Sequence, residues 1–247
     1  MLQYIKAELY RLARKRSTYI YYGVLVAAFV GIMLLLVNVD SPTFFLELGF
    51  GLVQVVSLFV TTQVFLAVYC DDIASKTYAN TISTGLSRTA LILSKVLLFV
   101  IHTVTVFIGL VLVYGGLYVY YGGSFEGTQL ILVQGLLKFL VCVIASSVAY
   151  ATLSSIVLLQ FQSSTISVAL YLFFNLGFVY NILNMVRNII PFLDEAMQFS
   201  ITEQIMNLMG SGPDLSLNVQ FFGIMAAYVL VSISISTFLF NKKEISV

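Results

Sequence analysis

The sequence predicts an all-α membrane protein, folded as a bundle of six transmembrane helices. Of its 247 residues, 60% are hydrophobic and 9% are charged, whereas soluble domains carry about 25% charged residues. Most of the apolar residues fall in runs of about 20, the helix length that crosses the roughly 30 Å hydrocarbon core of a bilayer. The alternating pattern typical of membrane β-strands is absent. We therefore expect one transmembrane domain over residues 1–247.

Six apolar runs are long enough to cross the membrane. The first follows a charged segment, but it is longer than the apolar core of a signal peptide and leads into Asn38-Val39-Asp40 rather than a small-residue cleavage site. We therefore expect it to be kept as a span. The six predicted spans are Tyr19–Val37, Leu48–Cys70, Val96–Tyr120, Gln129–Leu159, Ser164–Leu183 and Val219–Phe240.

The distribution of charge predicts the orientation of these spans. Ten of the 12 lysines and arginines fall on one side of the predicted bundle, which the positive-inside rule assigns to the cytoplasm. The prediction is a multi-pass plasma-membrane protein with both termini in the cytoplasm. A net charge of +1 gives no basic field for nucleic acid. The ten residues are Lys6, Arg11, Arg14, Lys15, Arg16, Lys76, Arg88, Lys95, Lys242 and Lys243.

Two polar segments on the cytoplasmic side are expected to form short helices. Residues 1–18 carry apolar side chains at three- and four-residue spacing, which predicts an amphipathic helix on the inner membrane surface. Residues 71–95 are too polar to span, and Asp71 and Asp72 favour a helix start while Gly85 favours a helix end. The apolar stripe of the first segment is Leu2, Ile5, Leu9 and Leu12.

The segment 184–218 is predicted to hold two short helices on the outer side. Pro191 suits a first helical turn, and Ser200 with Glu203 matches a capping box. These helices could gate a pathway between the spans or cover the bundle, and the sequence leaves both open.

Polar residues inside the spans are candidates for function. The chain has no phosphate-binding loop motif, so ATP would have to be bound by another chain. The one histidine, His102, is interpreted as a hydrogen-bonded interior group because zinc sites need three or four ligands. Lys138 lies about 14 Å into its span, where it either faces the interior or extends toward the surface. Candidate pathway residues are Lys138, Thr61, Gln63 and Asn175, although such side chains usually join helices.

The loop after the second span resembles that of the membrane subunits of type-2 ABC exporters, permeases for drugs, bacteriocins, lantibiotics and polysaccharides. That family has an acidic residue, a Gly-Thr pair, then Arg and Lys. The chain departs from it in three ways: aspartate replaces glutamate, lysine replaces glycine, and Gly85-Leu86-Ser87 replaces a proline-containing turn. The matching positions are Asp72, Lys76, Thr77, Arg88 and Lys95.

The resemblance extends to the amphipathic N-terminal helix, the six spans and the outer helices, but sequence specificity is confined to residues 6–95. It implies a permease that pairs with a second copy or a homologue, lies in membrane lipid, and docks on a separate ABC ATPase that binds ATP and Mg. The chain itself would bind no cofactor or metal and would catalyse no reaction. The implied ATPase-coupling residues are Asp72, Lys76, Thr77, Gly85, Arg88 and Lys95.

The expected function is thus transport of an amphipathic substrate, such as a peptide, bacteriocin or drug, out of the cell. The role of this transport could be export or self-immunity. Two alternatives remain. The chain could be an intramembrane enzyme that pairs His102 with Ser154 or Ser155, or a ligand-binding or scaffold component of another membrane complex.

Overall fold

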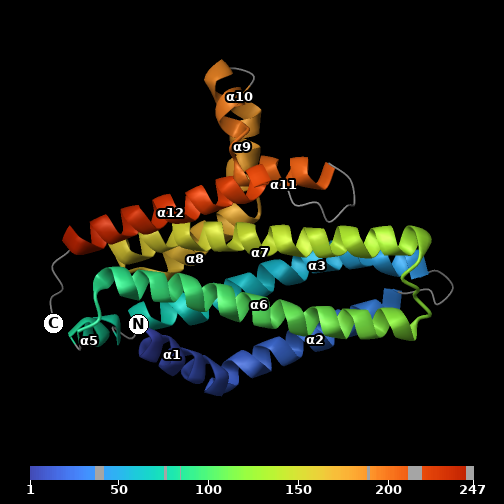
Figure 1. The fold of residues 1–247 in the computed structure, drawn as a ribbon, viewed down its shortest axis with the longest axis horizontal. Helices are drawn as coiled ribbons and strands as arrows, with labels where there is room; N and C mark the ends of the chain where they lie inside the picture. Colours follow the sequence, from blue (N-terminus) through green and yellow to red (C-terminus); the bar gives the residue numbers. More distant parts are fainter. Residues whose placement is uncertain (37–41, 75–76, 84, 188–189, 211–218, 243–247) are drawn as a thin grey trace.

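The computed structural model describes residues 1–36, 42–74, 77–83, 85–187, 190–210 and 219–242, and every regular element within them is helical. Five helices are long and apolar enough to cross a membrane, which marks the chain as a membrane protein. They lie roughly along the long axis of the molecule (Figure 1). These helices are α2 (Arg16–Leu36), α3 (Pro42–Phe65), α6 (Arg88–Tyr120), α7 (Gly127–Phe161) and α12 (Val219–Lys242).

The fifth predicted span, Ser164–Leu183, is not one straight helix. It is divided into α8 (Ser164–Asn175) and α9 (Phe178–Val186), whose axes differ by 59°. The break has a local cause, because Gly177 has φ +70°, a left-handed conformation that glycine adopts without steric cost. If this bent pair counts as one crossing, the number of spans is six.

Short helices complete the chain. α1 (Leu2–Arg14) meets α2 at an elbow near Lys15, whose backbone is extended. α9 and α10 (Pro191–Met197) project sideways from the bundle (Figure 1). Ser200 caps α11 (Ile201–Gly210) by accepting a hydrogen bond from the Glu203 amide at 3.2 Å. Residues 211–218 lie outside the described residues.

The second and third spans also differ from the predicted boundaries. α3 continues into a π-helical turn, η1 (Leu66–Cys70), and then into α4 (Asp71–Ala74). α5 (Thr77–Ser83) follows, and α6 begins at Arg88, eight residues before the predicted Val96. α6 and α7 have 33 and 35 residues, so each is about 50 Å long and exceeds the bilayer core.

α7 lies at the centre of the bundle. It packs against α3, α8 and α12, while α6 packs mainly against α3, α7 and α12. α1, α5 and the end of α12 gather at one end of the bundle, here called the α5 end, and the α6–α7 connection lies at the other end (Figure 1).

Candidate functional site at the α5 end of the bundle

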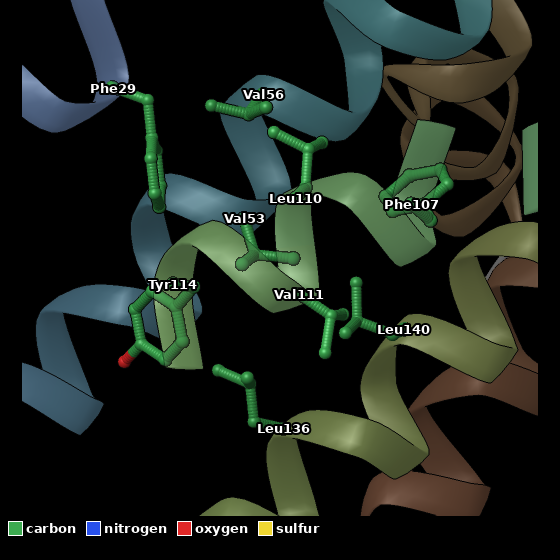
Figure 2. Close-up of a pocket in the computed structure, with 9 residues that line it drawn as sticks. All are labelled: Phe29, Val53, Val56, Phe107, Leu110, Val111, Tyr114, Leu136 and Leu140. Carbon is green, nitrogen blue, oxygen red and sulfur yellow. The ribbon is translucent and has the colours of Figure 1, made fainter. Parts of the chain in front are cut away.

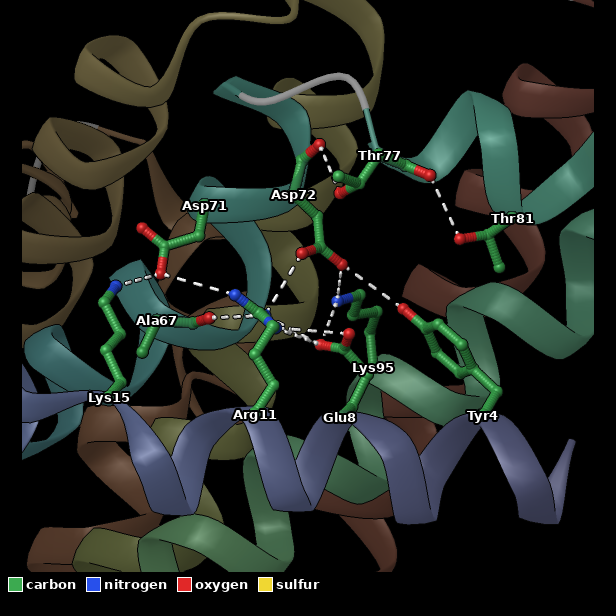
Figure 3. Close-up of polar contacts among 10 residues, drawn as sticks. All are labelled: Tyr4, Glu8, Arg11, Lys15, Ala67, Asp71, Asp72, Thr77, Thr81 and Lys95. Carbon is green, nitrogen blue, oxygen red and sulfur yellow. Dashed lines mark hydrogen bonds and ion pairs between the residues drawn. The ribbon is translucent and has the colours of Figure 1, made fainter.

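A continuous set of ion pairs and hydrogen bonds joins three segments at the α5 end (Figure 3). The side chains come from α1, from the two acidic residues that begin α4, and from the second turn of α6. This charge network consists of Tyr4, Glu8, Arg11, Lys15, Asp71, Asp72 and Lys95.

The Asp72 carboxylate is the centre of the network. It forms an ion pair with the Lys95 ammonium, while its Oδ1 lies 3.1 Å from Arg11 Nη2. Tyr4 donates its hydroxyl to Asp72 Oδ2 at 3.2 Å. Asp72 is 5% exposed and Lys95 6% exposed. Because charges removed from water lose several kcal/mol of hydration each, they require partners of this kind.

The rim of the network is more open. Glu8 receives a hydrogen bond from Arg11 Nη2 at 2.7 Å and lies 3.5 Å from Lys95 Nζ. Lys15 pairs with Asp71, and both side chains are about one-third exposed. Water screens the Lys15–Asp71 pair, so it contributes less than the buried centre.

Burial and charge shift the protonation equilibria of two network residues. Burial raises the pKa of Tyr4, and the Asp72 and Glu8 carboxylates raise it further. Burial alone would lower the pKa of Arg11, but its hydrogen bond to Glu8 and the charges of Asp72, Glu8 and Asp71 reverse that effect, and the net shift is upward. Tyr4 therefore stays a neutral donor and Arg11 a cation.

Local sequence explains how the network forms. Positions 4, 8 and 11 follow the helical period, so their side chains share one face of α1, and Lys15 follows directly after the helix. At the end of α3, the π-helical turn of η1 precedes Asp71, and such turns are frequent at functional sites. Arg11 also donates to the carbonyl of Ala67 within this turn at 3.4 Å.

α5 packs directly on the bundle through an apolar contact, here called the α5 seat. Both α5 and the bundle contribute residues to it. Tyr78 and Ile82 lie one turn apart on α5 and pack against a small apolar cluster. Gln162, at the C-cap of α7, donates its amide to the Tyr78 hydroxyl at 2.7 Å. The α5 seat consists of Tyr78, Ile82, Leu86, Leu91, Ile92 and Phe240.

Two further contacts fix the ends of this segment. Thr77 donates its hydroxyl to the backbone carbonyl of Asp72 at 3.3 Å, which ties α5 to the charge network. At the other end, Gly85 has φ +98°, and Ser87 caps α6 by accepting from the Ala90 amide at 3.2 Å. α5 is thereby linked to α4, α6, α7 and α12.

The residues predicted to couple the chain to an ATPase divide into two groups. Asp72 and Lys95 form the centre of the charge network, with Thr77 attached to it. Gly85 lies at the turn after α5, and Arg88 donates to the carbonyl of Phe240 and lies 5.4 Å from its ring. Lys76 lies outside the described residues.

The predicted pathway residues do not form one site. Thr61 and Asn175 lie close to Tyr171 together with Ser147, and these four residues are here called the mid-bundle cluster. Lys138 is fully buried, so its side chain does not reach the surface. It precedes Ser147 by nine residues on α7, about 14 Å along the helix. Gln63 is partly buried on α3.

The mid-bundle cluster is poorly hydrogen-bonded. Thr61 donates to the carbonyl of Ser57 on its own helix at 2.8 Å. By contrast, Tyr171 Oη, Ser147 Oγ and Asn175 Nδ2 are buried and make no hydrogen bond of normal geometry within the described residues. Thr61, Ser147 and Asn175 lie near enough to the Tyr171 hydroxyl to interact with it, but outside normal hydrogen-bond geometry.

His102 has its hydrogen-bond partner on α2, and the serines with which an enzyme hypothesis would pair it make no hydrogen bond to it. Its Nε2 is 3.1 Å from Tyr22 Oη on α2. Ser154 Oγ is buried and has no hydrogen-bond partner within the described part of the chain, and Ser155 donates to the carbonyl of Thr152. His102 is thus a partly buried, hydrogen-bonded side chain.

A small apolar cavity of about 30 Å³ lies between α2, α3, α6 and α7 (Figure 2). Its one polar side chain, Tyr114, donates its hydroxyl to the carbonyl of Phe45 at 3.0 Å. The space is about that of one water molecule and offers no polar partner, so it is a packing gap rather than a ligand site. Its lining residues are Phe29, Val53, Val56, Phe107, Leu110, Val111, Tyr114, Leu136 and Leu140.

Tyr4 and Glu8 were not among the site residues predicted from the sequence. Their signal was the polar stripe at positions 4, 8, 11 and 15, which borders the apolar stripe of the same helix.

Among the described residues, no group of three or more His, Cys, Asp and Glu side chains is placed to hold a metal ion. Comparison with protein-family models, curated proteins and solved structures gave no match.

Proposed function

We propose that this chain is the membrane-spanning subunit of an ATP-driven exporter similar to the type-2 ABC class. In this proposal the α5 end faces the cytoplasm, the chain crosses the membrane six times, and it pairs with a second permease copy or a homologue. ATP and Mg are bound by separate ATPase subunits, and the substrate is amphipathic, such as a peptide or a drug.

The attachment of α5 supports this proposal most strongly. Its inner side packs into the α5 seat, whereas Thr77 and Ser83 are exposed. A helix held in this way presents a surface to a partner and is in contact with several spans at once. An ordinary solvated loop would lack the apolar seat.

The charge network would transmit a displacement of α5 to the bundle. Separating a buried ion pair leaves an uncompensated charge at a cost of about 3–5 kcal/mol. α1, α4 and the start of α6 are therefore expected to move together when α5 is displaced. Nucleotide binding on the ATPase would then select one of two arrangements of the spans.

The mid-bundle cluster and the bend at Gly177 would supply the movable part of the pathway. α3 and α8 meet there through polar groups that share no hydrogen bond of normal geometry. Shifting α8 against α3 would break no hydrogen bond of normal geometry between the two helices. The substrate could therefore pass between them at low cost in free energy.

Co-purification of an ATPase tests the proposal. The chain is purified from its native membrane in mild detergent, and its partners are identified by mass spectrometry. The variant Ser83→Arg, which changes an exposed position of α5, should lose an ATPase that the unmodified chain retains. Thr128→Arg, an exposed position at the opposite end of the bundle, is the matched control and should retain it. Equal retention by the two variants would refute docking through α5.

A further inference from the structure

A groove of about 550 Å³ lies between the α1–α2 elbow and α6. Tyr19 and Ile101, which line it, are 60% and 39% exposed, so the groove opens at the outer surface of the bundle. On α6 the lining runs from Ile101 to Val113, about 18 Å along the helix axis. This is slightly more than half of the roughly 30 Å hydrocarbon core, the depth of one leaflet.

Most of the groove is apolar, with polar groups near the elbow. The Tyr22–His102 hydrogen bond lies in its wall. Thr18 also lines the groove, is 3% exposed, and its Oγ1 has no hydrogen-bond partner within the described residues. An apolar channel with a few polar groups at one end suits an amphiphile better than a fully polar ligand.

Two cations belong to the elbow next to the polar end of the groove, outside its lining. Arg14 and Arg16 are exposed in the elbow, between the lining residues Ala13 and Thr18. Lys15, which separates them, is paired with Asp71. The two arginines therefore place positive charge at the exposed surface of the elbow, and guanidinium groups bind phosphate with paired hydrogen bonds.

We propose that this groove binds an anionic phospholipid of the surrounding membrane. One acyl chain lies along α6 in the groove, and Arg14 and Arg16 bind the headgroup phosphate. Basic sites between membrane helices bind anionic headgroups in this manner. The assignment does not depend on the exporter proposal.

A lipid in this groove would also affect the charge network. Leu9 and Leu12 of α1 line the groove, and Glu8 and Arg11 of the same helix belong to the network. Lipid occupancy would therefore hold α1 in the position that keeps Asp72 paired.

The absence of tryptophan from the sequence allows a direct test by fluorescence. Ile101→Trp places one reporter at the groove, here called the groove reporter. Leu112→Trp, exposed on α6 outside the groove lining, is the matched outer reporter. Each full-length protein is reconstituted into phosphatidylcholine vesicles that contain brominated phosphatidylglycerol or, at the same bromine content, brominated phosphatidylcholine. Quenching measures which lipid contacts the reporter.

Two further changes locate the effect. Gly109→Leu narrows the groove, and its Cβ meets no atom within 4 Å. Gly116→Leu, also in open space on α6 and outside the groove lining, is its control. Arg14→Gln/Arg16→Gln removes the headgroup contacts.

We expect the groove reporter to show about a tenfold preference for brominated phosphatidylglycerol, since each arginine near an anionic headgroup contributes several-fold. The preference should persist with Gly116→Leu, and it should disappear with Gly109→Leu and with the double arginine change. Equal quenching of the groove reporter by both lipids, or an equal preference at the outer reporter, would overturn the proposal. If Ile101→Trp does not fold, the two glycine variants are compared in the tryptophan-free chain. The amount of phosphatidylglycerol that co-purifies with the protein is measured, and it should be lower for Gly109→Leu than for Gly116→Leu.

Discussion

At the α5 end, the buried Asp72 carboxylate is held by Lys95, Arg11 and Tyr4. Midway along the bundle, the equally buried Tyr171 hydroxyl has polar neighbours but makes no hydrogen bond of normal geometry within the described residues. Both regions place polar groups between helices. In the first region the groups restrain one another, and in the second they do not.

This difference indicates which parts of the bundle move as a unit. Breaking the charge network would strand a buried charge, which costs several kcal/mol. Rearranging the mid-bundle cluster would break no hydrogen bond between its members. The comparison therefore predicts a stiff α5 end and a more easily repacked contact between α3 and α8.

The largest effect is expected from Asp72→Ala. It leaves Lys95 buried with only the more distant Glu8 carboxylate nearby, so the free energy of unfolding should fall by about 3 kcal/mol. The measurement is SDS-induced unfolding in detergent micelles, followed by circular dichroism.

Asp71→Ala is the control for that change. It removes the neighbouring carboxylate, which is one-third exposed and pairs at the rim, and should cost less than about 1 kcal/mol. Similar losses for the two variants would mean that burial does not distinguish the centre of the network from its rim.

A smaller effect is expected from two tyrosine-to-phenylalanine changes, which should differ from each other. Tyr114→Phe removes a buried hydrogen bond to Phe45 and should destabilise the protein by about 1 kcal/mol, whereas Tyr171→Phe removes an unpaired hydroxyl and should be neutral or stabilising. The same unfolding assay compares them. Destabilisation by Tyr171→Phe equal to that by Tyr114→Phe would show that the mid-bundle cluster is hydrogen-bonded after all.

A local effect, confined to one short helix, is expected at the α5 seat. Tyr78→Phe keeps the ring against Phe240, 6.1 Å between ring centroids, but removes the hydrogen bond from Gln162. We expect amide hydrogen exchange in α5 to accelerate by roughly fivefold, which corresponds to about 1 kcal/mol. Exchange in α12 serves as the internal reference and should stay unchanged, and an unchanged rate in α5 would mean that this contact does not fix the helix.

Sequence patterns predicted much of the helical framework, because hydrophobic length is a direct consequence of the bilayer. They did not predict the bend after Asn175, since Leu176-Gly177 lies within a continuous apolar run and the left-handed φ of Gly177 depends on its surroundings. Similarly, Asp72 and Lys95 were identified as two of six coupling positions in one loop, and no contact between them was predicted. Their burial required the third segment, α1, whose approach no local pattern encodes.

The direct test of the proposed function is purification of the chain from its native membrane in mild detergent, followed by identification of its partners and an assay of ATP hydrolysis. The exporter proposal predicts a stoichiometric partner with a phosphate-binding loop and ATPase activity that is lost when Ser83→Arg releases this partner. A chain that purifies alone, without ATPase activity, would contradict it.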